Sequence, residues 1–399
     1  MTFDMASMFR ADLPSPAQIH TDDLPYAFVG GNNDAAAVPF TGLAEAAATV
    51  LSREGRNLAT YNLGGSALGY QPLRQFVAQS LHDRAAMSTD PDTVLLVSGS
   101  LQALDLVNDL LLERGDTVIV EEATYGGMLS RLQRLGVSYG GVSLDRDGLD
   151  TDHLRQLLTE YAAQGITPKY IYTIPTVQNP TGVIMSRDRR LALLDLAREF
   201  GVPIFEDDCY ADLAWGRERP PSIRALDDQT GTGGHVIYCG SFSKSIAPAL
   251  RVGYLVADSA VISQLLALKT DAGSGSLEQM VISEFATTHF DAHVEQLTKT
   301  LHNKSKVMVD AIRKHFDDDV IVEEPDGGIF VWLTFPDGVD TGAFAAAARD
   351  VGVEFNPGAG WSADPTWGSR RLRLCFGHPT IEEIEAGVAA LAGVYRAHP

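Results

Sequence analysis

Residues 93–107 read TVLLVSGSLQALDLV, and they carry the strongest indication of the fold. Thr93 is followed by the apolar run Val94–Val97 and then by Ser98-Gly99-Ser100, which is typical of a short buried strand that ends in a turn. From Leu101 onward, apolar residues recur at helical spacing. Strand, tight turn and helix in this order form the repeating unit of a parallel α/β sheet.

The same rhythm continues on both sides of this stretch. Residues 186–200 have an amphipathic helical pattern that Gly201 closes. Further strands are predicted at residues 117–120, 170–174, 202–205, 236–239 and 252–256. Alternating strands and helices predict an α/β fold, in which a mostly parallel sheet is sandwiched by helices. We assign residues 46–275 to this large domain.

The pattern changes after about residue 270, where residues 271–276 are polar and rich in glycine. A long helix is predicted from 276 to 316, and a smaller α+β domain over residues 276–399. The first 45 residues, 1–45, are expected to form an irregular segment that packs on the small domain and the active site. The remaining elements expected in the small domain are strands at 328–333 and 371–376 and helices at 341–351 and 380–397.

Charge and composition exclude several classes of function. The 399 residues carry a formal net charge of −21, which disfavours binding to nucleic acids and to anionic membrane surfaces. No apolar run approaches the roughly 18 residues that a membrane span needs. The N-terminus shows no secretory signal, and the three cysteines form no CxxC pair, so we expect a cytoplasmic protein without structural disulfides. The ten histidines form no spaced cluster, so no metal site is expected.

Reactive side chains follow almost every predicted strand. Ligands bind beyond the carboxyl ends of the strands in open α/β sheets, so these side chains are expected to share one site. The turn at 98–100 opens a helix, where free N–H groups suit a phosphate. The side chains that follow the other strands are Tyr125, Asn179, Asp207, Tyr210, Ser241, Ser243, Lys244 and Arg251.

One ligand matches this set of groups. The set comprises two anion-binding turns, a flat ring, a buried carboxylate, a phenol, a lysine and an arginine. These groups suit a phosphorylated aromatic heterocycle that has a basic ring nitrogen and an aldehyde. That ligand is pyridoxal 5′-phosphate, which proteins hold through a lysine Schiff base and an acidic partner for the pyridinium nitrogen.

The motifs also resemble those of a known family, the fold-type I aminotransferases. The most similar branch holds 2-aminoadipate and kynurenine aminotransferases and the aminotransferase-like domain of MocR-type regulators. The resemblance runs from about residue 30 to about residue 380. Its motifs are VQNPTG at 177–182, EDDCY at 206–210, SFSKSIAPALRVG at 241–253 and RLCF at 373–376.

The resemblance implies a role for each ring-contacting residue. Lys244 forms the Schiff base and later moves the Cα proton. Asp207 pairs with the pyridine nitrogen and keeps it protonated. Asn179 and Tyr210 form hydrogen bonds with the phenolic oxygen, and Tyr125 stacks on the ring. Lys244, Asp207 and Tyr210 are therefore the expected catalytic residues.

The resemblance also implies how phosphate and substrate are held. Arg373 pairs with the substrate carboxylate, while Asn179 and Gly31 lie near the substrate. Arg370 and Arg371 are expected to face solvent. In a homodimer, Tyr61 reaches the phosphate of the partner subunit's site. The phosphate is held by Ser100, Ser241, Ser243, Arg251 and the backbone N–H groups near Leu101.

Three segments depart from the family pattern. Leu101 stands where the family usually has glutamine. The family's Gly-Gly-x-Pro is here Gly30-Gly31-Asn32-Asn33, and the spacer at 62–68 is longer than expected. The second and third changes fall in segments that shape the substrate end of the site.

The first functional hypothesis is an aminotransferase that moves an amino group from an α-amino acid to a 2-oxo acid by a ping-pong route. A decarboxylase, lyase, cyclase or oxidase with the same cofactor is the alternative, because one fold supports all of these reactions. A third hypothesis is a non-catalytic effector-sensing domain. It would require a DNA-binding domain before Gly30, where about 30 residues stand, so we expect an enzyme.

Overall fold

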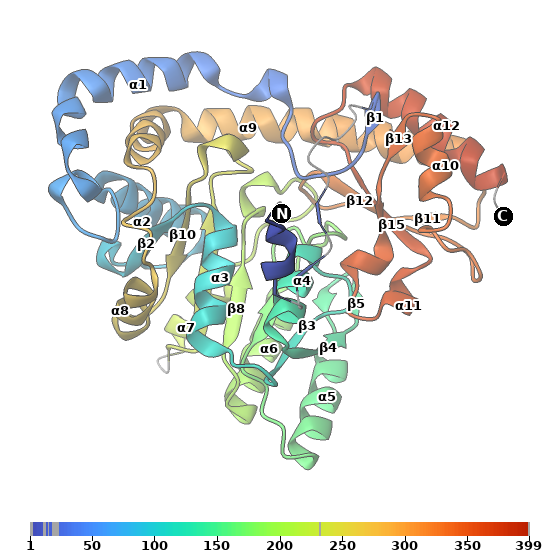
Figure 1. Cartoon of the computed structure of the whole chain (residues 1–399), viewed down its shortest axis with the longest axis horizontal. Coiled ribbons are helices and arrows are strands. Elements are labelled where there is room, and N and C mark those ends of the chain that lie inside the picture. The colour runs from blue at the N-terminus through green and yellow to red at the C-terminus, as the bar shows by residue number, and fades with distance from the viewer. Residues whose placement is uncertain (1–2, 11–12, 15, 18–23, 231–232, 398–399) are drawn as a thin grey trace.

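The computed structural model describes residues 3–10, 13–14, 16–17, 24–230 and 233–397. A seven-stranded sheet, in the order β2-β10-β9-β8-β7-β3-β4, forms its centre (Figure 1). Neighbouring strands are parallel except β10, which is antiparallel to both of its neighbours. The strands are β2 (Val94–Val97), β3 (Thr117–Glu121), β4 (Ser138–Val142), β7 (Ile171–Thr173), β8 (Ile204–Asp207), β9 (Val236–Ser241) and β10 (Gly253–Val256).

Helices cover both faces of the sheet, which confirms the predicted architecture. In β3, Val118 and Val120 pack into the core under one set of helices, whereas Ile119 packs into the core under the other. This alternation follows from the two-residue repeat of a strand. One face is covered by α3 (Ser100–Leu111), α4 (Gly126–Leu135) and α8 (Ser259–Leu268), and the other by α5 (Thr151–Ala163), α6 (Arg187–Phe200) and α7 (Ile223–Gln229).

The expected helix at 186–200 has the termini that its sequence predicts. The Ser186 hydroxyl accepts a hydrogen bond from the Arg189 N–H at the first turn. Gly201 ends the helix with φ of 68°, a conformation that costs glycine little. The edge strand β4 was not predicted, because its sequence SYGGV contains two glycines and lacks a continuous apolar run.

A smaller domain lies beside the large one. Its antiparallel sheet has the order β11-β12-β15-β14, with β11 (Ile321–Val322), β12 (Phe330–Thr334), β15 (Arg371–Cys375) and β14 (Asn356–Pro357). The helices α10 (Ala345–Asp350) and α12 (Ile381–Ala397) share a hydrophobic core with it, and α11 (Pro365–Gly368) precedes β15. In the large domain, a hairpin of β5 (Leu144–Asp145) and β6 (Gly148–Leu149) follows β4.

One long helix, α9 (Ser276–His315), runs along both domains (Figure 1). Its residues from Met280 to Val294 share a core with α1 (Phe40–Glu54) and α2 (Gln71–Ala85). Its residues from Leu297 to Ile312 share a core with α12 and β12. The helix that follows the glycine-rich break therefore packs on both domains, and the domain boundary at residue 275 stays a prediction.

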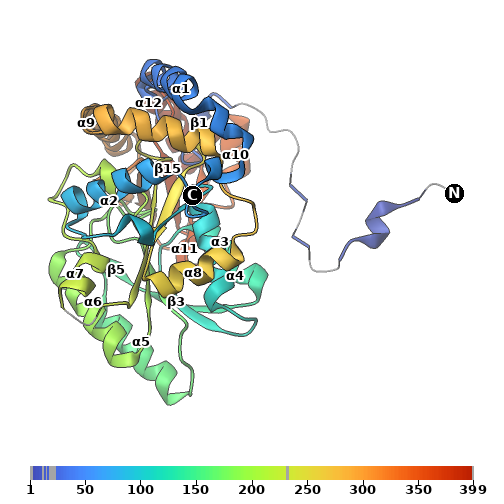
Figure 2. The same ribbon diagram turned by 90° about the vertical axis from the view of Figure 1, so that its left-hand side faces the viewer.

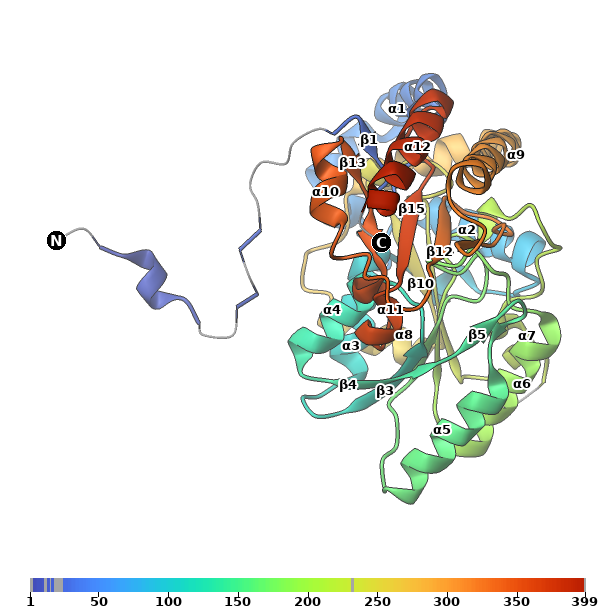
Figure 3. The same ribbon diagram turned by 90° about the vertical axis from the view of Figure 1, so that its right-hand side faces the viewer.

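The N-terminal segment lies partly against the body of the protein. The strand β1 (Tyr26–Ala27) pairs in parallel with β13 (Val353–Glu354) of the small domain. Residues 3–10 are exposed and lie away from the body (Figures 2 and 3). The rest of the expected segment 1–45 includes residues 1–2, 11–12, 15 and 18–23, which lie outside the described residues. Among the residues described, none of the helices is long and apolar enough to cross a membrane.

Candidate active site

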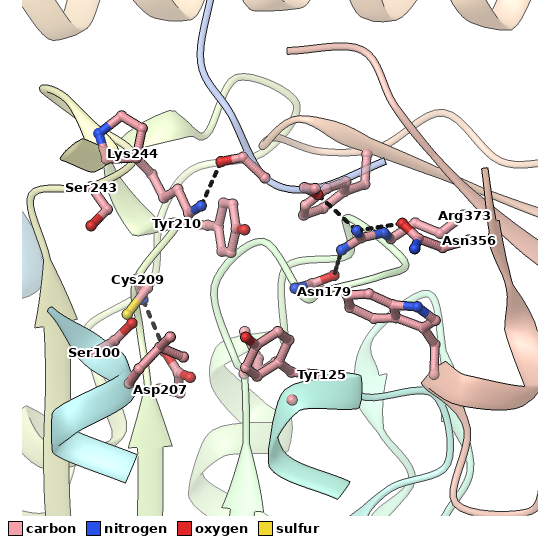
Figure 4. A pocket seen from close by; sticks show the side chains of 18 of the residues that line it. Ser100, Tyr125, Asn179, Asp207, Cys209, Tyr210, Ser243, Lys244, Asn356 and Arg373 are labelled. Carbon is pink, nitrogen blue, oxygen red and sulfur yellow. Dashed lines mark hydrogen bonds between the residues drawn. The ribbon is translucent and has the colours of Figure 1, made fainter. Parts of the chain in front are cut away.

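The predicted site residues meet in a cavity of about 390 Å³ at the carboxyl ends of the parallel strands. The large domain contributes the loops after β2, β3, β7, β8 and β9, and the small domain contributes β12, β14 and β15. Figure 4 shows Lys244 and Asp207 on one side of this cavity and Arg373 on the other. The predicted residues that line it are Gly31, Ser100, Leu101, Tyr125, Asn179, Asp207, Tyr210, Ser243, Lys244, Arg251 and Arg373.

Lys244 follows β9 and directs its amine into the cavity (Figure 4). Its Nζ donates a hydrogen bond to the Gly31 carbonyl at 2.6 Å and lies 5.4 Å from the centre of the Tyr210 ring. Burial lowers the pKa of Lys244, because the charged form loses hydration. The amine therefore loses its proton more readily than a surface lysine does, and becomes a better nucleophile.

Asp207 ends β8 and is buried at the floor of the cavity. The Tyr172 hydroxyl donates to its Oδ2 at 2.7 Å, and the Cys209 backbone N–H donates to its Oδ1 at 3.3 Å. Burial raises the pKa of Asp207, and these hydrogen bonds oppose that rise. A buried carboxylate with two neutral donors is suited to pair with a cationic ligand group.

The neighbouring carboxylate belongs to a different network. Asp208 accepts hydrogen bonds from Arg219 at 2.9 Å and from the Tyr238 hydroxyl at 3.0 Å, and it does not line the cavity. Asp208 is therefore part of a buried ion pair behind the site. Of these two neighbouring acids, only Asp207 lines the cavity.

An anion-binding cradle lies at the N-terminus of α3, where the first backbone N–H groups have no partner within the helix. Arg251 approaches this turn, and its Nη2 donates to the Ser98 carbonyl at 3.2 Å. A Cβ atom on Gly99 would lie 2.4 Å from that Nη2, so a larger residue would displace the guanidinium from its present position. Ser241 does not line the cavity; its hydroxyl accepts from the Ser243 N–H at 3.1 Å and orders the turn before Lys244.

Arg373 on β15 faces the cavity from the small domain and is 2% exposed. Its Nη1 donates to Asn179 Oδ1 at 3.1 Å, and its Nη2 donates to the Gly30 carbonyl at 2.7 Å and to Asn356 Oδ1 at 2.8 Å. These acceptors are neutral, and its Nε has no partner in the described structure. Burial lowers the pKa of Arg373 to about 10, so the group remains a cation near neutral pH.

Aromatic side chains hold this guanidinium in place. Its central carbon lies 3.5 Å from the centre of the Trp361 ring and 3.9 Å from that of Phe330. Stacking of this kind stabilises a cation without neutralising it. Arg373 is thus a buried positive charge that no carboxylate of the described residues pairs with, which is the chemistry of a carboxylate-binding site.

Comparisons with known proteins agree with this geometry. The family model described as aminotransferase class I and II matches residues 31–391. The chain belongs to this family. An aromatic-amino-acid aminotransferase 1 from Thermococcus litoralis is 32% identical over 331 residues, which cover 82% of this chain and 78% of that protein.

Two further relatives extend the comparison. The crystal structure of an alpha-aminoadipate aminotransferase from Thermus thermophilus, complexed with N-(5′-phosphopyridoxyl)-L-leucine, has a TM-score of 0.86 and is 32% identical. The match covers 93% of this chain and 92% of that one. An uncharacterised HTH-type transcriptional regulator from Bacillus subtilis is 32% identical over 81% of this chain and 65% of its own length.

This chain is a pyridoxal phosphate-dependent aminotransferase, which transfers an amino group from an α-amino acid to a 2-oxo acid. The predicted family, reaction and cofactor are thereby confirmed. The side chains of this aminotransferase also fit the cofactor. The Gly99 turn with Arg251 suits its phosphate, Asp207 suits its ring nitrogen, and the amine of Lys244 suits its aldehyde.

Several residues of the aminotransferase site were not predicted. Tyr172, Phe330, Asn356 and Trp361 contact Asp207 or Arg373, yet none belongs to a predicted motif. Tyr172 lies inside a predicted strand, which hides its role. Asn356 is opposite Arg373 in the pairing of β14 with β15, and the sequence showed no strand at 356–357.

Two residues named in the sequence analysis, Arg371 and Tyr61, do not line the cavity. Arg371 was expected to face solvent, and this is wrong: it is buried, with its guanidinium 3.3 Å from the centre of the Trp367 ring. In a strand, residues two apart share a face, so Arg371 points to the same side as Arg373. Tyr61 is 83% exposed and lies by a surface hollow with residues 271–274, away from the cavity.

The described residues include one cluster with the ligand types of a metal site. The potential ligand atoms of Asp207, Cys209 and Cys239 lie within 4.8 Å of one another. Asp207 already accepts hydrogen bonds from Tyr172 and Cys209, and it faces the cofactor cavity. We therefore assign this cluster to the cofactor site, and the absence of a metal stays a prediction.

Proposed function

We propose that Lys244, Asp207 and Tyr210 are the catalytic residues of this aminotransferase and that Arg373 binds the carboxylate of both substrates. The observation that carries this proposal is the arrangement of the two cations. A lysine of lowered pKa and an arginine that pairs with no carboxylate of the described residues line the same cavity, and both form hydrogen bonds to the segment Gly30–Gly31. An α-amino acid needs one group for its amine end and one for its carboxylate.

Each side chain then has a defined task. When bound, pyridoxal phosphate supplies an electron-poor ring that accepts the electron pair of the broken Cα–H bond. Lys244 would take the proton from the substrate Cα and deliver it to the carbon that comes from the cofactor's aldehyde, acting first as a general base and then as a general acid. Asp207 stabilises positive charge on the ring nitrogen, while Asn179 and Tyr210 donate toward its phenolic oxygen. Tyr125 stacks on the ring, and Ser100, Ser243, Arg251 and the N–H of Leu101 hold the phosphate.

Arg373 also distinguishes transamination from decarboxylation. Two parallel hydrogen bonds hold a carboxylate in one orientation, which selects the Cα bond that stands perpendicular to the ring. A carboxylate held in this way is retained, and the Cα–H bond is the one that breaks. Quantifying the 2-oxo acid and carbon dioxide formed in one turnover tests this: the reaction should release the oxo acid alone.

We expect Arg373→Lys to weaken transition-state binding of every α-amino acid and 2-oxo acid, because an ammonium cannot reproduce the paired hydrogen bonds. The expected loss is about 2–4 kcal/mol, the range for disturbing a buried charge pair. Stopped-flow measurement of the two half-reactions should show both slowed together.

Arg370→Lys is the matched control, because Arg370 bonds to the Phe335 carbonyl and to the exposed Asp337 outside the cavity. It should leave both half-reactions unchanged. Slowing of only one half-reaction in Arg373→Lys, or a wild-type preference for amines that lack a carboxylate, would contradict the assignment.

The remaining wall of the cavity favours amino acids whose side chains are uncharged. Among the described residues that line it, the cations are Lys244, Arg251 and Arg373, and each has a task already. Phe330 and Trp361 offer apolar surface beside Arg373. A second substrate charge would lie unpaired, which is costly in a buried site.

We therefore expect apolar and aromatic amino acids to exceed dicarboxylic ones in kcat/KM by at least roughly tenfold. A screen of amino donors with one common acceptor measures this preference. A higher kcat/KM for aspartate or 2-aminoadipate than for leucine and phenylalanine would contradict it.

We propose that the enzyme is a homodimer in which Tyr61 serves the partner's site. Tyr61 is exposed, as are the large apolar side chains of Phe40 and Leu51 on α1 and of Leu58 after it. In such a dimer, mixing Lys244→Ala with Tyr61→Ala subunits rebuilds one complete site per hybrid, so the mixture should reach about a quarter of wild-type activity, above what either variant has alone. Activity that does not return on mixing, or a fully active monomer in sedimentation, would contradict this.

The cytoplasmic location also remains a prediction.

A further inference from the structure

One short segment, Gly30–Asp34, touches both cations of the site. The Gly30 carbonyl accepts a hydrogen bond from Arg373 at 2.7 Å, and the Gly31 carbonyl accepts one from Lys244 Nζ at 2.6 Å (Figure 4). A Cβ atom on Gly31 would lie 2.8 Å from that Nζ, so the backbone itself forms the wall here. The position of this segment therefore influences where both cations lie.

Two side chains of the same segment anchor it. Asn33 is 5% exposed, and its Nδ2 donates to the Lys244 carbonyl at 2.9 Å and to the Ser243 carbonyl at 3.4 Å. Asp34 forms an ion pair at 2.8 Å with Lys304 of α9, whose Nζ also donates to the Gly377 carbonyl at 3.0 Å. The segment is thus tied to the Lys244 turn and to the long helix.

Asn33 is one of the positions where the chain departs from the Gly-Gly-x-Pro pattern, which has proline there. Proline has no side-chain donor and cannot form either of the two hydrogen bonds. Both ends of Lys244 are consequently held by one segment: Asn33 holds its backbone carbonyl, and Gly31 holds its Nζ. A flexible four-carbon side chain fixed at both ends loses most of its freedom before the reaction starts.

We propose that Asn33 is a positioning residue, which holds the Lys244 turn against the Gly30–Gly31 segment and so aligns the amine with the aldehyde of the cofactor. The inference rests on the proposed role of Lys244. Asn33 does not line the cavity, so it acts only through Lys244. Attachment of pyridoxal phosphate forms a bond between Nζ and the aldehyde carbon and releases one water, so this step reports directly on alignment.

The test compares two ligands on the cofactor-free protein. Pyridoxal phosphate bonds to Lys244, whereas pyridoxamine phosphate has no aldehyde and reports only on the phosphate cradle and the ring contacts. Asn33→Ala should slow attachment of pyridoxal phosphate, trapped with borohydride, by about tenfold, since a small misplacement of a reacting group is costly. Its affinity for pyridoxamine phosphate should stay within about twofold of wild type, because alignment of the lysine is not needed there.

Asn32→Ala is the matched control, because Asn32 is exposed in the same segment, and it should change neither quantity. Unchanged attachment in Asn33→Ala, or an equal loss for both ligands, would overturn the proposal. If Asn33→Ala does not fold, Asp34→Asn is the second test, because it weakens the other anchor of the segment without touching Lys244. Attachment of pyridoxal phosphate to Asp34→Asn at the wild-type rate would then overturn the proposal. Peptide mapping that finds the wild-type label away from Lys244 would instead refute the proposed catalytic lysine.

Discussion

Lys244→Ala is expected to abolish turnover, with a loss of at least about 10⁴-fold, the upper range for a single acid–base group. The variant loses both the amine that bonds to the cofactor and the base that moves the Cα proton. It should still bind pyridoxal phosphate non-covalently, because the cradle of Ser100, Ser243 and Arg251 and the ring contact of Tyr125 remain. Dialysis against buffer, followed by absorbance and activity measurements, separates the two effects.

Borohydride reduction supplies the control for this prediction. In the wild type it should fix the cofactor on the peptide that contains Lys244, and on none of the other six lysines. Burial lowers the pKa of Lys244 from the ordinary value of 10.5, and only the neutral amine attacks the aldehyde. The rate of attachment should therefore rise with pH and level off below 10.5. A label on another lysine, or a midpoint at the value of an ordinary lysine, would contradict the assignment.

Asp207→Asn should lower activity by several orders of magnitude, on the order of 10³-fold or more, because it removes the charge that stabilises the protonated ring. The amide keeps the shape of the carboxylate and can still accept from Tyr172, so the fold should survive. An unprotonated pyridine is a weak acceptor for the electron pair of the Cα–H bond. The rate of the first half-reaction under single-turnover conditions measures this loss.

Asp208→Asn is the matched control, since it makes the same chemical change one residue away. Asp208 pairs with Arg219 at 2.9 Å, and breaking such a buried pair leaves an uncompensated charge. We therefore expect Asp208→Asn to lower the free energy of unfolding while its half-reaction rate stays near that of the wild type. If the two variants exchange these effects, Asp208 rather than Asp207 is the acid that faces the ring.

Local sequence was sufficient for the main architecture. Residues 93–107 predict β2, the turn and α3, because apolar spacing reports directly on which face of a strand or helix is buried. The cofactor followed from the same information. Parallel strands place their carboxyl ends at one edge of the sheet, so residues that follow strands, such as Asn179, Asp207 and Lys244, converge without knowledge of the tertiary contacts.

Only the tertiary structure decided the substrate end of the site. Asn356 and Phe330 meet Arg373 because β14 and β12 pair with β15 in the small domain, and Asn179 reaches the same guanidinium from a loop of the large domain. Trp361, which follows β14, stacks on it. No periodicity in the sequence records such contacts, since the partners lie in different elements. Arg371 shows the same limit: its burial against Trp367 depends on a short helix that precedes it, not on the alternation of its own strand.

The anchor at Asn33 marks the boundary between the two kinds of information. The sequence shows that the residue departs from the family pattern, because that comparison needs only the order of residues. Its hydrogen bond to Lys244 joins residues 211 positions apart, which the chain brings together only when the N-terminal segment folds over the sheet. Local patterns thus determined which groups the protein carries and at which sheet edge they lie, whereas packing between distant segments decided which of them touch.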